Sequence, residues 1–510
     1  MAPQFEWIPP GQEVEIAYAG RQFRADVLFP DDPAWAYRRK PVRLARADHV
    51  QGKTVSVRLP GRAVGTAAVE TLAPCRPPVV DGDTIRFTPP APGHYVIRAD
   101  SCFACFLFLD PAPDYSDLTD GRTIIEADTL QPGAPVPQTA ELQALIDRAA
   151  RERRGTILRL PPGTLLTGTL RMRSGVYLHI HDDTVLKGTP DRTHYPVDPK
   201  VAGLSIARSR LLHFLDVEDC GLIGRGAVDG NGSLMRHRAL LEGERQKRVP
   251  SNLVRIHRCS NLHFRDVSLR DSEFWNTHIL DSENIHFRNT KLINEIPPRQ
   301  WDPVHPDYTW NNADGINPDA SREIRVDGLF AYCGDDCLPV KNTGNARDPR
   351  RGTEDCVFRD LTLVSETTVM KIGTETRGPV FRNIRFENIL QLDSGAPMGV
   401  MLRDGATVES LIVKNLRALR CRGAPYLRTE RRRPEQAGPP GVIGSVSFED
   451  WDLRYAGAGP DTVPAIELEQ SGDLRHLCLN RITVNGTNTA IRPTLPPPGG
   501  SIQPPAGSSN

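Results

Sequence analysis

The sequence has no excess charge of either sign and no long hydrophobic run. Lys+Arg and Asp+Glu both number 63, so the net charge is zero and no overall field would attract nucleic acid or an anionic membrane. No segment approaches the roughly 18 apolar residues that span a bilayer, and the first residues lack the basic and apolar parts of a signal peptide. We therefore expect no nucleic-acid or membrane partner. We expect a cytoplasmic protein, or a secreted or periplasmic one if a leader is missing.

Cysteine is too sparse for a disulfide framework. The ten cysteines are scattered from Cys75 to Cys478. Cys102 and Cys105 form a CxxC that could be a redox or metal motif. Without a second such pair or a nearby helix start, we interpret them as ordinary thiols of a buried strand. We predict no metal site and no cofactor.

Signals for long helices are also scarce. The 42 glycines and 45 prolines favour tight turns and β structure. One amphipathic helix is predicted over residues 139–151, with Thr139 as its cap and apolar residues Leu142, Leu145, Ile146 and Ala149 at helical spacing.

The first 112 residues differ from the rest of the chain. Short apolar segments alternate there with Pro/Gly turns, which predicts an N-terminal antiparallel β-sandwich over residues 1–112. A polar, Pro-rich stretch follows, and we place a linker at residues 113–135. The low-complexity end, residues 491–510, is predicted to be a disordered tail.

Between these segments a short phrase recurs, approximately apolar-x-apolar-x-Asn/Asp-apolar-x-apolar, in copies 23 to 39 residues apart. The copies begin at Asn261, Asn284, Glu323, Asp355, Asn383, Ser410, Ser445 and His476. Each copy resembles two short strands joined at a polar corner, and only stacking of the copies would build a core. Residues 136–490 are therefore predicted to form a parallel β-helix. A leucine-rich repeat is the competing solenoid, but the Leu spacing and helical half-repeats that it needs are missing.

Three insertions interrupt the repeat, at about residues 295–312, 342–352 and 422–440. We expect them to be loops that project from the solenoid wall, where repeat proteins usually bind their partners. If the loops cluster over one end of a groove, they would block a long polymer and favour cleavage from chain ends.

Three aspartates are the sharpest chemical feature. Asp314 and the pair Asp335/Asp336 are 21 residues apart, about one coil, so stacking would place them side by side. Carboxylates this close in a partly dry groove do not all ionise easily, so one should hold a proton near neutral pH. A proton donor beside water-activating carboxylates is what hydrolysis of a glycosidic bond requires. Asx turns, or a Ca²⁺ or corner motif, are the alternative.

With these motifs the chain resembles glycoside hydrolase family 28, the polygalacturonase-like, right-handed parallel β-helix enzymes. The resemblance covers about residues 120–485 and includes the paired Asn-x-Asp-Gly and Gly-Asp-Asp motifs. Other matching segments are Leu160–Leu170, Gly224–Gly232 and Ser272–His278. The resemblance implies an inverting glycosidase without a cofactor. By position, Asp335 would be the general acid, and Asp314 with Asp336 would activate water. Lys341 matches a lysine that often follows the Asp pair, although a solvated ion pair is an equal alternative.

The chain departs from the family pattern in two places. Thr367 stands where the family usually has the His of Gly-His-Gly, and only Arg403 remains near the place of the usual Arg-Ile-Lys. These departures leave the identity of the sugar open. Lys371 and Glu375 could face the groove and bind substrate, or form a surface ion pair. Tyr308 and Trp310, on the insertion before Asp314, could stack on sugar rings.

The sequence therefore predicts a glycoside hydrolase that acts on a pectin-type or related saccharide, with a carbohydrate as its partner. Three alternatives stay open at this point. They are an α-glucan hydrolase of the dextranase or isopullulanase type, a polysaccharide lyase that would use Ca²⁺, and a carbohydrate-binding β-helix without activity.

Overall fold

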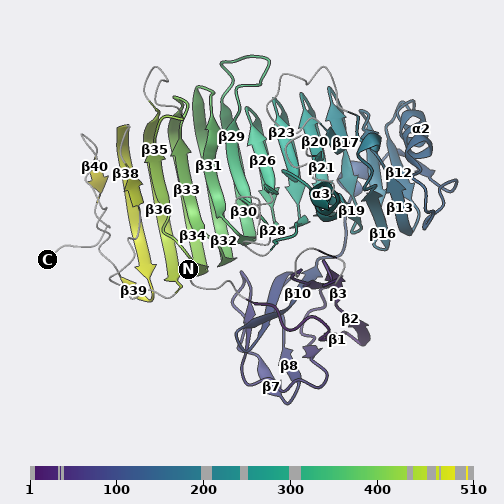
Figure 1. Ribbon diagram of the computed structural model, residues 1–510, viewed down its shortest axis with the longest axis horizontal. Helices are drawn as coiled ribbons and strands as arrows, with labels where there is room; N and C mark the ends of the chain where they lie inside the picture. The colour runs from purple at the N-terminus through teal and green to yellow at the C-terminus, as the bar shows by residue number, and fades with distance from the viewer. Residues whose placement is uncertain are drawn as a thin grey trace. The chain divides into compact units, whose positions relative to one another are not determined.

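The structure is a computed structural model of the chain. It describes residues 6–32, 35, 39–196, 209–241, 251–297, 312–432, 440–456, 467–469, 473–488 and 501–503. The chain divides into two compact units (Figure 1). One comprises Met1–Asp114 with Glu295–Trp310, and the other comprises Tyr115–Asn294 with Asn311–Asn510. None of the helices in the described ranges is both long and apolar enough to cross a membrane.

The first unit contains two five-stranded sheets. One has the order β2-β1-β5-β8-β7, with β1 (Glu15–Tyr18), β2 (Arg21–Arg24), β5 (Val55–Arg58), β7 (Val79–Asp81) and β8 (Thr84–Phe87). The other has the order β3-β4-β10-β9-β6, with β3 (Asp26–Leu28), β4 (Val42–Asp48), β6 (Ala67–Glu70), β9 (Gly93–Ala99) and β10 (Cys102–Asp110). Apolar residues of both sheets form one core, as expected for a β-sandwich.

One strand pair of the sandwich differs from the antiparallel expectation. β10 pairs with β9 in the antiparallel sense but with β4 in the parallel sense. The chain visits the other sheet between β4 and β10, and a connection of that length allows a strand to return in the same direction. Cys102 and Cys105 both lie on β10 as free thiols, in agreement with the interpretation as strand cysteines.

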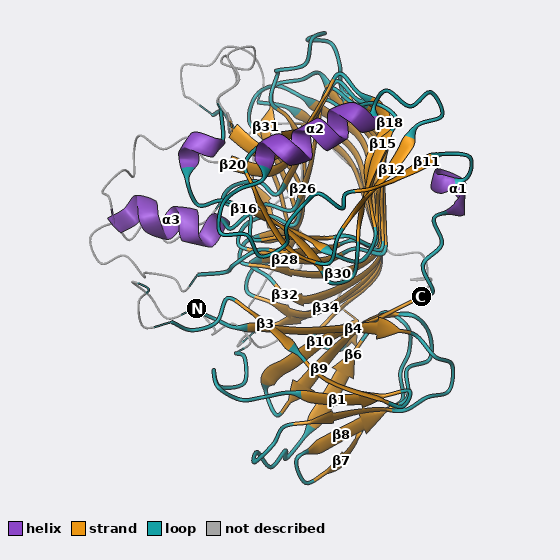
Figure 2. Ribbon diagram, turned by 90° about the vertical axis from the view of Figure 1, so that its right-hand side faces the viewer, coloured by secondary structure: helices purple, strands orange, loops and turns teal. Residues whose placement is uncertain are grey.

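The second unit begins with short elements at one end of the coil stack. These are α1 (Ser116–Thr119), β11 (Thr123–Glu126) and α2 (Thr139–Ala149). Figures 1 and 2 show α2 at the N-terminal end of the β-helix, and its buried residues are Leu142, Leu145, Ile146 and Ala149, as predicted. The predicted Thr cap is wrong. Gln138 occupies the cap position, because the Thr139 hydroxyl instead accepts a hydrogen bond from Gly168 N at 2.7 Å.

The body of this unit is a parallel β-helix, as predicted. A ten-stranded parallel sheet comprises β14 (Leu170–Arg171), β17 (Ser209–Leu215), β20 (Ser251–His257), β23 (Thr277–Leu280), β26 (Ile316–Asp319), β29 (Leu338–Asn342), β31 (Thr368–Thr376), β33 (Ala396–Leu402), β35 (Tyr426–Thr429) and β37 (Glu467–Glu469). In the sheet each strand pairs with the equivalent strand of the next coil.

A twenty-stranded sheet forms the remaining walls. Besides β11 it comprises β12 (Thr156–Leu160), β13 (Gly163–Thr167), β15 (Val176–Ile180), β16 (Thr184–Gly188), β18 (Glu218–Ile223), β19 (Ala227–Asp229), β21 (Ser260–Arg265), β22 (Ser268–Arg270), β24 (Glu283–Arg288), β25 (Lys291–Ile293), β27 (Arg322–Asp327), β28 (Phe330–Cys333), β30 (Thr353–Ser365), β32 (Val380–Asp393), β34 (Thr407–Cys421), β36 (Val442–Tyr455), β38 (Asp473–Val484), β39 (Thr487–Asn488) and β40 (Ser501–Gln503). The leucine-rich alternative does not fit coils built from strands.

Two shorter helices interrupt the coils, η1 (Arg192–His194) and α3 (Gly232–Leu241). Of the predicted disordered tail, Ser501–Gln503 form β40, which pairs with β38. The other residues of that tail lie outside the described ranges.

The recurring Asn/Asp positions lie near the ends of strands: Asn261 and Asn284 are the second residues of β21 and β24, and Asp266 and Asn289 follow these strands. The backbone is left-handed, with φ between 52° and 62°, at Asn261, Asp266, Asn284 and Asn289. Asparagine and aspartate tolerate this conformation better than most other residues do. Their side chains also connect coils, since Asn289 Nδ2 donates to Asp266 Oδ1 at 2.5 Å and Asn284 Nδ2 donates to Asn261 Oδ1 at 3.3 Å. Inside, equivalent aromatics stack, as in Phe264 on Phe287 at 4.6 Å.

Replacing Asn289 separates backbone strain from hydrogen bonding. Asn289→Ala should lower the free energy of unfolding by about 2–3 kcal/mol, because alanine is strained at positive φ and the bonds to Asp266 and Lys291 are lost. Asn289→Gly loses the same bonds without the strain, so its loss should be smaller by about 1 kcal/mol. Urea denaturation followed by tryptophan fluorescence measures both. Equal losses would contradict a strained corner.

Candidate functional site

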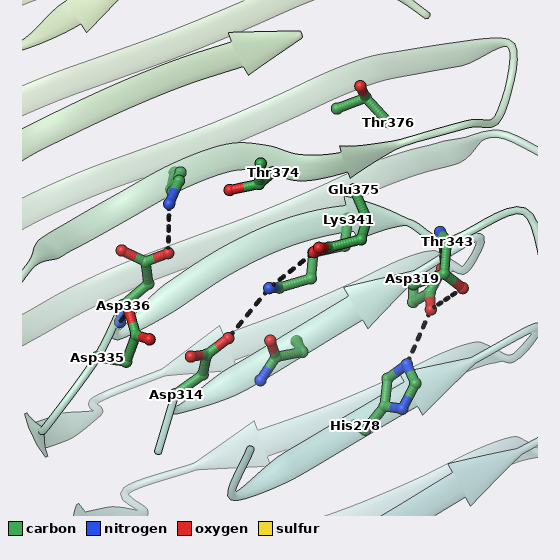
Figure 3. Close-up of polar contacts among 12 residues, drawn as sticks. His278, Asp314, Asp319, Asp335, Asp336, Lys341, Thr343, Thr374, Glu375 and Thr376 are labelled. Atoms are coloured by element: carbon green, nitrogen blue, oxygen red, sulfur yellow. Dashed lines mark hydrogen bonds and ion pairs between the residues drawn. The ribbon is translucent and has the colours of Figure 1, made fainter. Parts of the chain in front are cut away.

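The three aspartates lie at the N-terminal ends of neighbouring strands in the ten-stranded sheet. Asp314 precedes β26, and Asp335 and Asp336 precede β29 one coil later. The backbone links the coils directly here, because Gly315 N donates to Asp336 O at 2.9 Å. A side chain at residue 315 would collide with Cys337 O, 2.2 Å from the position of a Cβ atom, so glycine is what allows the coils to approach. Figure 3 shows the resulting cluster of carboxylates.

All three carboxylates are buried, with exposed fractions of 1% for Asp314, 4% for Asp335 and 3% for Asp336. Burial, together with the charge of Asp336, raises the pKa of Asp335 to about 7. Burial also raises the pKa of Asp314 well above its usual range, against the opposing charge of Lys341. The site therefore holds at least one proton near neutral pH, and Asp335 is a carboxylic acid poised to give it up.

Lys341 is the cation next to Asp314. Its Nζ lies 3.1 Å from Asp314 Oδ2, an ion-pair distance without hydrogen-bond geometry, and donates a hydrogen bond to Glu375 Oε2, also at 3.1 Å. Burial alone would lower the pKa of Lys341, but Asp314, Glu375 and Asp336 together raise it above the usual value. The ammonium also lies 3.9 Å from the centroid of the Trp275 ring, a cation–π distance. Lys341 is thus a buried, positively charged side chain of the site.

Lys371 is the cation next to Asp336. Lys371 lies on β31 in register with Pro339 of β29, and its Nζ donates to Asp336 Oδ2 at 2.7 Å. Burial opposes the charge of this lysine, but Asp336 raises its pKa above the usual value. The structure thus places the Lys371 ammonium against Asp336, where the sequence had allowed either substrate binding or a surface ion pair.

Thr367 contributes a contact that the sequence did not predict. Its hydroxyl lies 2.9 Å from Asp335 Oδ1 and 2.9 Å from Asp336 Oδ1. Its backbone N donates to Ser365 Oγ, which in turn donates to Asp335 O. The only signal for this contact was position, since Thr367 follows the Asp pair by about one coil.

Other predicted residues lie elsewhere or outside the described ranges. Arg403 follows the C-terminal end of β33 and pairs with Glu430 at 2.9 Å, and none of its described contacts reaches the three aspartates. Tyr308 and Trp310 lie outside the described residues. Trp275, interpreted from the sequence as a core residue, is buried but faces Lys341.

Sequence analysis missed a polar group around Asp319, at the C-terminal end of β26. His278 Nε2 and Asp319 Oδ2 are 2.8 Å apart, and Thr343 donates to Asp319 from both N and Oγ1 (Figure 3). Burial and the nearby Arg255 charge lower the pKa of His278 to about 4, so at neutral pH the ring is uncharged. Burial alone would raise the pKa of Asp319, but the bonds from His278 and Thr343 lower it. The register of the strands, and not the sequence spacing alone, brings these residues together.

The insertion at 342–352 lies away from the aspartates. Arg347 N donates to Asp281 Oδ2 at 3.1 Å and Arg351 pairs with Asp281 at 3.2 Å. This loop follows the C-terminal end of β29, whereas Asp335 and Asp336 precede its N-terminal end. The described parts of the chain contain no group of three His, Cys, Asp or Glu side chains arranged to hold a metal ion.

Lys341 should be essential for stability as well as for the charge of the site. Lys341→Met should lower the free energy of unfolding by about 3–5 kcal/mol at pH 7, because it leaves Asp314 and Glu375 without their shared cation. Without it, the pKa of Asp314 in the folded protein rises further, so the destabilisation should grow as the pH rises from 5 to 8.

Glu375→Gln provides the matched control for this change. The double variant Lys341→Met/Glu375→Gln should lose less than the sum of the two single losses, because the two side chains share one ion pair. Urea denaturation at pH 5, 6.5 and 8 measures all three variants. Additive losses, or a loss independent of pH, would contradict the assignment of Lys341 as the counter-charge.

Comparison with known proteins places this site in context. Residues 201–347, which include the three aspartates, match the sequence model of Glycosyl hydrolases family 28. A probable polygalacturonase from Vitis vinifera is 27% identical over 262 residues, which cover 49% of this chain and 50% of that protein. An endo-polygalacturonase from Pectobacterium carotovorum subsp. carotovorum is 21% identical over 282 residues, 48% of this chain and 67% of that protein. The chain thus spans half of the length of the Vitis vinifera relative.

Solved structures share the fold. A polygalacturonase from Erwinia carotovora ssp. carotovora matches 75% of this chain and 97% of its own, with a TM-score of 0.54 and 16% identity. An endo-xylogalacturonan hydrolase from Aspergillus tubingensis matches 75% of this chain and 99% of its own, with a TM-score of 0.53 and 12% identity. At these identities the similarity establishes a common β-helix architecture.

Proposed function

We propose that this protein is a glycosidase that hydrolyses a pectin-type or related saccharide, because residues 201–347, with all three aspartates, match the sequence model of Glycosyl hydrolases family 28. The observation that carries the proposal is the cluster of Asp314, Asp335 and Asp336, buried together with one carboxyl whose pKa is raised to about 7. Relatives named as polygalacturonases support the choice of a pectin-type substrate.

In the proposed reaction Asp335 gives its proton to the glycosidic oxygen as the bond from the sugar carbon to that oxygen breaks. Water attacks the same carbon from the opposite face and gives a proton to the carboxylate group formed by Asp314 and Asp336. The products are two saccharides, one with a new hydroxyl at the attacked carbon. The acquired proton then leaves to solvent and Asp335 regains one, so the reaction consumes one water and needs no cofactor.

Substrate contacts are proposed for Lys341, Lys371 and Glu375. Each ammonium has three N–H donors, and the described contacts of Lys371 use one of them. The remaining donors are available for sugar hydroxyls. We keep Arg403, Tyr308 and Trp310 as proposed contacts for more distant sugar units, and cleavage from chain ends as the proposed mode of attack.

The test is release of reducing ends from pectic, rhamnogalacturonan and α-glucan oligosaccharides. Wild-type protein should hydrolyse a pectic substrate, and Asp335→Asn should lower kcat/KM by about 10²–10⁴-fold because the amide has no acidic proton. Since the acid works only when protonated, activity should fall as the pH rises through about 7. Product lengths separate cleavage at chain ends from internal cleavage.

Asp348→Asn is the control, because Asp348 lies on an exposed loop and pairs with Arg350. It should leave activity unchanged. Binding without hydrolysis by the wild type would favour the carbohydrate-binding alternative, and an ultraviolet-absorbing unsaturated product would favour the lyase. An α-glucan as the hydrolysed substrate would favour the dextranase-like alternative.

A further inference from the structure

Asp335 and Asp336 are adjacent in the chain but have different hydrogen-bond environments. Asp336 receives three donors, the Lys371 ammonium at 2.7 Å, Thr368 N at 3.2 Å and the Thr367 hydroxyl at 2.9 Å. Donors of this number, one of them charged, stabilise an ionised carboxylate. Asp336 is therefore ion-paired with Lys371, and three of its roughly four lone pairs accept hydrogen bonds.

Asp335 has fewer donors. Its Oδ1 is within hydrogen-bonding distance of Asp336 N, at 2.8 Å, and of the same Thr367 hydroxyl, at 2.9 Å. A hydroxyl has one hydrogen, so Thr367 can donate to only one of the two aspartates at a time. Among the described residues, no donor reaches Asp335 Oδ2. This oxygen is the one left to carry a transferable proton.

Asp314 has the opposite environment to Asp336. Among the described residues, no donor with hydrogen-bond geometry reaches either carboxyl oxygen of Asp314, although both oxygens are buried and Lys341 Nζ lies 3.1 Å from Oδ2. A buried carboxylate without donors is a stronger base than one with three donors. In its ionised form, Asp314 is therefore the carboxylate best suited to receive a proton from water.

We propose that Thr367 and Lys371 are positioning residues that give the three aspartates separate roles. They hold Asp336 as an ion-paired carboxylate, so that Asp335 alone donates the proton and Asp314 alone receives one from water. This inference rests on the proposed hydrolytic function and deepens it. Asp336 then acts as the ion-paired neighbour that raises the pKa of Asp335.

The Thr367 hydroxyl supports both stages of the reaction. While Asp335 is protonated, the hydroxyl donates to the ionised Asp336. When Asp335 has given its proton to the leaving oxygen, the hydroxyl can turn by rotation about its C–O bond and donate to Asp335 Oδ1, where negative charge has appeared. Because both distances are 2.9 Å, no atom other than hydrogen has to move.

The charged groups around Asp335 set the direction of each expected shift. Asp336 raises the pKa of Asp335, whereas Lys371, Lys341 and the Thr367 hydroxyl lower it. The other titratable groups that face these carboxyls are Asp314, the Cys333 thiol and the Tyr426 hydroxyl.

The test is the pH profile of kcat/KM, whose fall at high pH reports loss of the Asp335 proton in the free enzyme. Thr367→Val and Lys371→Met should each move this fall upward by about one pH unit, the equivalent of one charge-assisted contact. Asp336→Asn should move it downward, because a negative neighbour is removed. Asp314→Asn should lower kcat/KM at least tenfold more than Asp336→Asn does.

Thr367→Ser is the matched control, since it retains the hydroxyl and should retain the wild-type profile. A role of Thr367 in folding alone would reduce activity without moving the fall, and would overturn the proposal. So would equal profiles for Thr367→Val and Thr367→Ser, or equal losses for Asp314→Asn and Asp336→Asn.

A measurement independent of activity separates this inference from the proposed function. Because Asp335 holds its proton more tightly when folded than when unfolded, it contributes stability that is lost as the pH rises towards about 7. In Thr367→Val this decline should continue to about one pH unit higher, and in Thr367→Ser it should end at the wild-type pH. If wild-type protein hydrolyses no saccharide, the proposed function fails. The decline in stability still decides the role of Thr367, and an unmoved end point would overturn it.

Discussion

Hydrogen bonding between successive coils is the constraint on which the site depends. The backbone bond from Gly315 to Asp336 fixes the distance between coils, and with it the distance between the carboxylates that flank β26 and β29. The approach is possible only because residue 315 has no side chain. Once the coils are in register, three acidic side chains share one small buried volume, and the electrostatics of the site follow from that geometry.

Buried carboxylates need compensation, and the two lysines supply it differently. Lys371 forms a hydrogen-bonded ion pair with Asp336. Lys341 lies between Asp314 and Glu375 and, within the described part of the chain, has hydrogen-bond geometry to Glu375 but not to Asp314. The first arrangement fixes a charge, and the second lowers the cost of a charge without occupying the oxygens of Asp314. A catalytic carboxylate must be both tolerated in the folded protein and free to exchange a proton. In the proposed reaction, the arrangement around Asp314 would meet both demands, and that around Asp336 would meet only the first.

The sequence was most informative where a particular backbone conformation favours particular residue types. Asn and Asp at positions with a left-handed backbone, such as Asn284 and Asp266, made the repeat visible and so predicted the β-helix. The spacing of 21 residues predicted that Asp314 lies beside the Asp pair. It was least informative where side chains meet across coils. Lys371 was considered a substrate ligand or a surface ion pair, and its contact with Asp336 depends on the register between Pro339 and Lys371, which the 342–352 insertion hides from any sequence count. The cap at Gln138 was missed for the same reason, since Thr139 is engaged by Gly168 from another turn of the chain.

Residue 367, which lies next to Asp335, is a threonine in this chain. The resemblance to family 28 places a histidine there in most members, and the loss of that side chain could be interpreted as loss of function. The structure instead places a hydroxyl at equal distances from two carboxylates. A hydroxyl carries no charge of its own, so the charge that steadies the pair must come from another residue, and Lys371 provides it at 2.7 Å. Thr367 and Lys371 therefore together supply a neutral donor and a cation beside the Asp335/Asp336 pair.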